Sequence, residues 1–208
     1  MVYYMFHKPS GCISARKDVE KKTVLDYFRA DDSAQAAVER IFPVGRLDKD
    51  TEGLLILTDD GKFCDKLMHP KHHVEKTYLF WTIGAADDRQ IKELEKGVLL
   101  TGELEMTKPA KIEIIHSGDY EEYASQMDKN WLSKVKVKPH GQKVMCGYIT
   151  ISEGRKHQVK RMLKYAHCYV VYLKRISIGS LRLDEKLAPG EYRELTREEI
   201  ELLTGGLE

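Results

Sequence analysis

The chain has 208 residues, of which 42% are hydrophobic and 32% charged, and its formal net charge is +1 at pH 7. This composition can build the core of one sizeable domain or two small lobes. No stretch has the apolar length that crosses a bilayer, the start lacks the features of a signal peptide, and the four scattered cysteines form no CxxC pair, so we expect a globular cytoplasmic protein without disulfides.

Hydrophobic periodicity and turn residues divide the chain into strands and helices. In chain order, they predict a strand at residues 2–7, helices at about 23–29 and 31–40, a strand at 53–58, a helix at 61–68, a strand at 75–83, a helix at 87–96, strands at 110–115 and 147–152, a helix at 155–166 and a strand at 169–178. The strands outnumber the helices and do not alternate with them in βα units. This pattern favours an α+β fold with a largely antiparallel sheet.

Charge is distributed unevenly along the chain. Residues 154–175 contain seven Lys or Arg and no Asp or Glu, whereas residues 184–208 contain eight acids and three bases. In the predicted helix 155–166, Val159, Met162, Leu163 and Ala166 form an apolar stripe and the basic residues lie off it. This segregation suggests a basic groove for phosphates, and a solvated helix face is the alternative.

A charged loop precedes one of the predicted strands. Residues 45–53, GRLDKDTEG, hold three carboxylates and two cations between glycines, directly before the apolar run of residues 54–58. A loop that leads into a buried strand is held rigidly, as a catalytic carboxylate requires. We therefore predict a functional site here.

Residues 45–61 resemble the signature of the pseudouridine synthases that modify ribosomal RNA, in the branch of ribosomal small subunit pseudouridine synthase A and its large-subunit relatives. Further matching motifs follow in the family's order: FHKPSG at 6–11, MHP at 68–70, VEKTY at 74–78, TKPA at 107–110, EGRKHQVKRM at 153–162 and LAPGEYR at 187–193. The resemblance implies a mixed, largely antiparallel sheet with flanking helices and a central RNA-binding cleft. It also implies isomerisation of uridine to pseudouridine without a cofactor.

The resemblance further implies a single catalytic domain over residues 1–208, with two lobes formed roughly by residues 1–50 with 170–208 and by residues 51–169. Members of this branch often carry a small S4-like RNA-binding domain before the catalytic part, and this chain lacks a match to it. Residues 117–142 match the family least and are highly charged. We expect them to form a mobile hairpin or loop, whose lysines either contact RNA or are simply solvated.

The reaction breaks the bond between C1′ and N1, turns the base, and joins C1′ to C5. The resemblance assigns the nucleophile to Asp48. Attack at C1′, attack at C6 and removal of a sugar proton all stay open. A buried cation keeps such a carboxylate ionised, and the resemblance assigns this role to Lys160, where most relatives have Arg, with Arg161 as the rival.

The target uridine must leave its stacked helix to reach the site. The resemblance assigns Tyr78 to stacking on the extruded base, with possible proton transfer. Arg46 lies two residues before Asp48 and is suited to filling the gap that the base leaves, or to binding a flanking phosphate. Four residues of the basic segment are the other candidates for RNA binding: Arg155, His157, Arg161 and Lys164.

Three alternatives remain beside modification of 16S rRNA. The first is the same reaction on 23S rRNA, and the second is a non-catalytic RNA-binding factor in ribosome assembly. The third is a metal-dependent phosphodiesterase using Asp48, Asp50 and Glu52, which the neighbouring Arg46 and Lys49 disfavour because they repel divalent ions. We expect no metal site and no membrane contact, a monomer, and ribosomal RNA, free or in an assembling subunit, as the partner.

Overall fold

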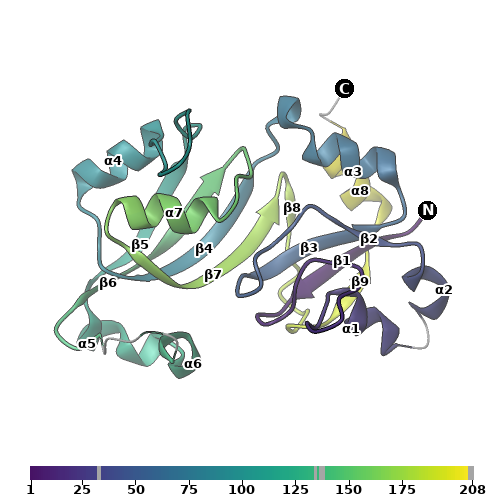
Figure 1. The fold of residues 1–208 in the computed structure, drawn as a ribbon, viewed down its shortest axis with the longest axis horizontal. Helices are drawn as coiled ribbons and strands as arrows, with labels where there is room; N and C mark the ends of the chain where they lie inside the picture. Colours follow the sequence, from purple (N-terminus) through teal and green to yellow (C-terminus); the bar gives the residue numbers. More distant parts are fainter. Residues whose placement is uncertain (32–33, 134, 136–138, 206–208) are drawn as a thin grey trace. The chain divides into compact units, whose positions relative to one another are not determined.

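The computed structural model describes residues 1–31, 34–133, 135 and 139–205 (Figure 1). The chain forms two compact units, residues 1–75 with 174–208 and residues 76–173. The hydrogen-bonded strand order is β5-β6-β4-β7-β3-β1-β9, with β2 on β3 and β8 on β7. The resemblance implies a lobe boundary near residue 50, whereas the first compact unit continues to residue 75. It includes β3 (Glu52–Thr58), which pairs with β1 (Tyr3–Lys8).

The first unit contains most of the short elements. Besides β1 and β3 it has β2 (Phe42–Val44), the end of β7 (Tyr169–Ile178), β8 (Leu181–Arg182), β9 (Tyr192–Glu194), α1 (Leu25–Arg29), α2 (Gln35–Val38), α3 (Gly61–Met68), the 3-10 helix η2 (Pro70–His72) and α8 (Arg197–Thr204). Strands β1, β2 and β9 pair antiparallel with their neighbours, and β3 pairs parallel with β7. The sheet is therefore mixed, as the sequence predicts.

Two layers of apolar side chains hold the first unit together. One face of β1 and β3 packs Met5, Leu54 and Ile56 against Phe63 of α3. On α1, Phe28 stacks on the ring of Tyr192, with centroids 3.9 Å apart. Helix α3 begins where its N-cap Asp60 accepts hydrogen bonds from two backbone N–H groups, which satisfies donors that a helix start leaves without partners.

The second unit is built on three antiparallel strands. It has β4 (Lys76–Ile83), β5 (Lys111–Asp119), β6 (Lys143–Ile151), the start of β7, α4 (Asp88–Lys96), α5 (Tyr120–Tyr123), the 3-10 helix η3 (Ala124–Gln126), α6 (Lys129–Leu132) and α7 (Gln158–Tyr165). Strand β6 pairs with β4 over the whole of β4, and with β5 through a bulge between Ile114 and His116. Helix α4 has a capping box formed by Asp87 and Gln90.

The segment 117–142 differs from the hairpin or loop that we expected. It continues β5 to Asp119 and then forms α5, η3 and α6, and Met127 is 5% exposed. The ring of Trp131 stacks on Tyr172 of β7, with centroids 4.0 Å apart. These aromatic contacts, which no local pattern indicated, explain the difference. The lysines at 134, 136 and 138 lie outside the described residues, and the mobility of the segment stays a prediction.

The predicted strands and helices are confirmed in kind, with shifts at their ends. The helix predicted at 155–166 begins at Gln158, because His157 has a left-handed backbone with φ +53°. Strands β2, β8 and β9 and helix α8 were not predicted. No helix of the described residues has both the length and the apolar character of a membrane span.

Candidate active site

The charged loop lies in the first unit, between β2 and β3. Leu47 is 6% exposed, whereas Arg46 is exposed and Asp48 half-buried, the alternation of an extended segment. The hydroxyl of Ser14 donates to Leu47 O (2.9 Å) and accepts from Leu47 N (3.0 Å). A turn follows, in which Thr51 N donates to Asp48 O at 3.1 Å. The backbone around Asp48 is thus held on both sides.

A buried lysine also holds this loop through hydrogen bonds to its backbone. The side chain of Lys8, at the end of β1, is fully buried. Its Nζ donates to the carbonyl oxygens of Pro9 (3.0 Å), Lys49 (3.2 Å) and Thr51 (2.8 Å). Three charge-assisted hydrogen bonds use all the donors of an ammonium group. Two of them end in the loop, directly after Asp48.

The surroundings of Lys8 have two opposite effects on its pKa. Burial lowers the pKa of Lys8, and the acidic groups of Cys12, Asp50, Glu52 and Asp48 oppose this shift. Desolvation disfavours an ammonium group, and nearby carboxylates favour it. Lys8 therefore places a cation under the carboxylates of the loop, a role that we did not predict.

Gly53 allows β3 to approach β7 closely. Its φ is +106°, and a Cβ there would lie 2.1 Å from Arg175 O and 2.7 Å from Arg175 N. Gly53 and Arg175 are partners in the parallel pairing, and Arg175 Nε donates to Leu54 O at 2.8 Å. Only glycine fits this backbone and this spacing. The second glycine of the loop motif is thus required by the joining of β3 to β7.

We expect Gly53→Ala to lower the free energy of unfolding by more than about 3 kcal/mol, because backbone strain and a clash with Arg175 act together. Gly141→Ala is the matched control: its φ is +72° and a Cβ would meet nothing within 4 Å, so only the backbone strain of about 1–2 kcal/mol applies. Urea unfolding of both variants measures the difference. Equal losses would show that the contact with Arg175 is unimportant.

His7, next to Lys8, makes the stability of the protein depend on pH. Its Nδ1 lies 2.7 Å from Leu187 O, and its Nε2 is buried without a hydrogen-bond partner in the described structure. Burial lowers the pKa of His7 below its ordinary value of 6.5, against the effect of the bond to Leu187. The unfolded chain therefore binds a proton at a pH where the folded chain does not.

Unfolding free energy should accordingly fall as the pH drops below about 6.5, the ordinary histidine value. His7→Phe removes this contribution. The free energy of unfolding of the variant should therefore decrease less between pH 8 and pH 5.5 than that of wild type. The variant also loses the hydrogen bond to Leu187, which costs about 1 kcal/mol at every pH. Urea unfolding at both pH values tests this, and an unchanged pH dependence in the variant would contradict it.

The second unit carries Tyr78 and Lys160. Tyr78 lies on β4 opposite Ile149 of β6 and is 9% exposed. Lys160 is half-buried in the first turns of α7. Asp48 belongs to the first unit and these two residues to the second, so the pairing of Asp48 with Lys160 and the stacking by Tyr78 stay predictions.

The motif at 153–162 builds a network of hydrogen bonds within the second unit. Glu153 accepts from Lys108 N (2.9 Å) and from Gln158 Nε2 (2.7 Å), and pairs with Arg155 Nε (3.3 Å). Gln158 Oε1 in turn accepts from Arg155 N at 2.9 Å. Glu153, which we did not assign to the site, connects the TKPA motif to the start of α7.

Both predicted RNA-binding arginines of this segment have partners within the protein. Arg161 forms an ion pair with Glu103 at 2.7 Å, and Arg155 donates to the carbonyl oxygens of Glu105 (2.8 Å) and Met106 (2.6 Å). The structure thus brings these two arginines to one loop. His157 and Lys164, at the two ends of α7, are exposed.

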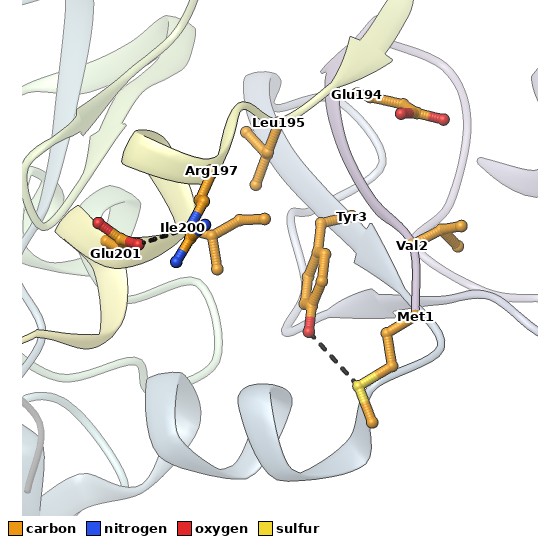
Figure 2. Close-up of a pocket in the computed structure, with 8 residues that line it drawn as sticks. All are labelled: Met1, Val2, Tyr3, Glu194, Leu195, Arg197, Ile200 and Glu201. Atoms are coloured by element: carbon orange, nitrogen blue, oxygen red, sulfur yellow. Dashed lines mark hydrogen bonds and ion pairs between the residues drawn. The ribbon is translucent and has the colours of Figure 1, made fainter.

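A surface pocket lies elsewhere in the first unit, as Figure 2 shows. Eight residues line it: Met1, Val2, Tyr3, Glu194, Leu195, Arg197, Ile200 and Glu201. It lies at the start of β1, whereas Lys8 is at the end of that strand, about 17 Å away at 3.3 Å per residue. Within the described part of the chain, no three His, Cys, Asp or Glu side chains gather as metal ligands.

Comparison with known proteins identifies the class. The family of RNA pseudouridylate synthases matches residues 2–165. An uncharacterized RNA pseudouridine synthase of Bacillus subtilis (strain 168), YtzG, is 43% identical over 202 residues, which cover 97% of this chain and 73% of that protein. The chain therefore belongs to the RNA pseudouridylate synthase family, and it is a pseudouridine synthase.

Within the family, the chain is similar to the small-subunit branch. Ribosomal small subunit pseudouridine synthase A is 40% identical in Haemophilus influenzae, over 97% of this chain and 73% of that protein. The Escherichia coli (strain K12) enzyme is 39% identical, with 95% and 72% covered. A crystal structure of a pseudouridylate synthase superposes with a TM-score of 0.78 at 38% identity, covering 98% of this chain and 74% of that one. These findings confirm the family and fold class that the motifs predicted.

Proposed function

We propose that this protein converts a uridine of 16S rRNA to pseudouridine, with Asp48 as the nucleophile. The observation that carries the choice of RNA is the likeness to ribosomal small subunit pseudouridine synthase A over 95–97% of the chain. The relative from Bacillus subtilis is named for RNA only, which makes 23S rRNA the alternative target. An rRNA substrate implies a cytoplasmic location.

The geometry of each unit supports the roles that we assign. The backbone of Asp48 is held by Ser14 through Leu47, by the turn to Thr51 and by Lys8, so the carboxylate is presented by a rigid loop, as covalent catalysis requires. In this proposal, Asp48 attacks an extruded uridine, Lys160 keeps it ionised, and Tyr78 stacks on the base.

The RNA-binding residues divide into two groups. Arg46, His157 and Lys164 are exposed, and we assign them to phosphates or to the gap left by the extruded base. Arg155 and Arg161 hold a loop of the protein itself, which favours a positioning role over direct phosphate contact.

Mapping of pseudouridines in rRNA from cells with and without this protein tests the function. We expect one position of 16S rRNA to lose its pseudouridine in the cells that lack the protein. Loss of a position in 23S rRNA would move the target to the large subunit, and an unchanged map would favour the non-catalytic assembly factor.

A second assay separates the enzyme from a metal-dependent phosphodiesterase. The purified protein should release tritium from C5 of uridine-labelled 16S transcripts in the presence of EDTA, because the reaction needs no metal. Loss of activity on adding EDTA, with cleaved RNA as the product, would support the phosphodiesterase instead.

A further inference from the structure

A short hairpin of the second unit, residues 97–107, connects α4 to β5 (Figure 1). Gly97 has φ +99°, and a Cβ there would lie 2.2 Å from Thr107 O. Val98 N donates to Thr107 Oγ1 (3.0 Å), Thr107 N donates to Val98 O (2.9 Å), and Leu99 bridges to Met106. The base of the hairpin is therefore closed tightly by its own backbone.

Two arginines fix the tip of this 97–107 hairpin. Arg161 of α7 donates to Thr101 O (2.7 Å) and pairs with Glu103 (2.7 Å). Arg155 donates to the carbonyl oxygens of Glu105 (2.8 Å) and Met106 (2.6 Å). Charge-assisted hydrogen bonds reach backbone oxygens on both sides of the tip. The tip is therefore more restrained than a solvated loop would be.

The side chain at this restrained tip is apolar and fully exposed. Leu104 is 101% exposed, and Leu99 and Met106 on the same hairpin are 54% and 58% exposed. One exposed leucine is ordinary. Three large apolar side chains exposed on one hairpin, two of them at bridged positions, are more than scattered exposure, and exposed apolar surface of this kind marks interaction sites.

The charges beside the patch indicate which partner it takes. Residues 101–110 and 153–164 together carry six cations and three carboxylates. Of the carboxylates, Glu103 and Glu153 are paired with arginines, and Glu105 is the exposed one. Lys156 and Lys164 are exposed on the segment that holds the hairpin. The tip itself carries Glu103, which is paired with Arg161, and the exposed Glu105. An apolar tip held by a basic segment fits a polyanion that has apolar faces, which describes the stacked bases of RNA.

We propose that Leu104 is an apolar wedge that enters a base step in a helical part of the RNA substrate. This inference rests on the proposed function and adds a binding element outside the motifs. Leu side chains act in this way in other nucleic-acid complexes, where partial unstacking of a step is compensated by the contacts that the opened helix makes. Arg155 and Arg161 are positioning residues, since they hold the hairpin in place for insertion.

The test compares three variants on folded and unfolded RNA. Leu104→Asn replaces the wedge by a polar side chain of similar size, Leu104→Met keeps it apolar, and Leu202→Asn alters a leucine of α8 that is 59% exposed. On a folded 16S transcript, Leu104→Asn should lower kcat/KM about 10- to 100-fold, as expected for loss of one buried leucine side chain. Leu104→Met and Leu202→Asn should stay near wild type.

The single-stranded control decides whether opening of the helix is involved. On a short oligonucleotide that contains the target uridine but cannot pair, Leu104→Asn should match wild type, because no step has to be opened. An equal loss on both RNAs, or activity within twofold of wild type on the folded transcript, would overturn the proposal. Urea unfolding should be unchanged, since the side chain contacts solvent.

A readout without turnover keeps this inference separate from the proposed function. We would incorporate p-benzoyl-phenylalanine at position 104 or, as the control, at position 202, and irradiate each protein with purified rRNA and with ribosomal subunits. Position 104 should cross-link to nucleobases and position 202 should not, even if 16S rRNA proves not to be modified. Absence of RNA cross-links from position 104, or cross-links to ribosomal proteins alone, would overturn the wedge.

Discussion

Asp48→Asn is expected to lower pseudouridine formation at least about 10⁴-fold, because the amide cannot act as the nucleophile. The fold should persist, because Asn keeps the shape of the side chain and the backbone oxygen of Asp48 still accepts from Thr51 N. Single-turnover tritium release from a labelled 16S transcript measures the rate. Filter binding with the same RNA should show that affinity is kept.

Asp50→Asn is the matched control in the same loop. Asp50 is exposed two residues further along, and we expect its loss to change the rate less than about threefold, as for an exposed charge. If Asp48→Asn kept more than a tenth of the activity, the assignment of the nucleophile would be wrong. If both variants were inactive and EDTA inhibited the wild type, a metal site formed by these carboxylates would explain the activity better.

Lys8→Met is expected to lower the free energy of unfolding by at least about 2 kcal/mol, because hydrogen bonds from a charged donor, worth roughly 1.5–3 kcal/mol each, are lost. The carbonyl oxygens of Pro9, Lys49 and Thr51 would lose the Lys8 ammonium group as a donor. Lys49 O would keep the hydrogen bond from Gly11 N, whereas the buried bond to Thr51 O would be lost. Urea unfolding measures the loss. Lys62→Met, at an exposed position of α3, should stay within about 0.5 kcal/mol of wild type.

The same variant tests whether Lys8 positions the loop that carries Asp48. Below its unfolding transition, Lys8→Met should show a lower kcat with little change in KM, because the loop loses two of its hydrogen bonds while the exposed RNA-binding residues are untouched. A KM effect alone would place Lys8 in RNA binding. Full kcat in a destabilised variant would limit Lys8 to the fold.

Most helices and strands could be predicted from the sequence because hydrophobic periodicity and capping residues lie within the elements themselves. The apolar run at residues 54–58 and the periodic pattern at 87–96 became β3 and α4, with Asp87 as N-cap of the latter. Short strands such as β2 and β9 have three residues each and carry no periodic signal of their own. They exist because β3 and β1 offer them backbone partners.

In the candidate site, too, some features follow from local sequence and others only from contacts between distant segments. The resemblance at residues 45–61 assigns the nucleophile to Asp48, which stays a prediction, and the motif FHKPSG contains Lys8 without indicating its role. The only sign of this role in the sequence was the position of a lysine at the end of an apolar strand, because a lysine side chain that is buried there needs hydrogen-bond partners. Its partners, Lys49 and Thr51, lie more than 40 positions along the chain, a distance over which no pattern in the sequence is informative.

The order and chemistry of the motifs determined, from the sequence by itself, that this chain is a pseudouridine synthase with an α+β fold. Only the tertiary structure decided that Lys8 lies beneath the charged loop, that Gly53 permits the approach of β3 to Arg175, and that Arg161 holds Thr101, which is 60 positions away. The physical reason is that a motif states which chemical groups are present. Burial and hydrogen bonding between distant segments then determine whether each group reacts, binds or supports its neighbours.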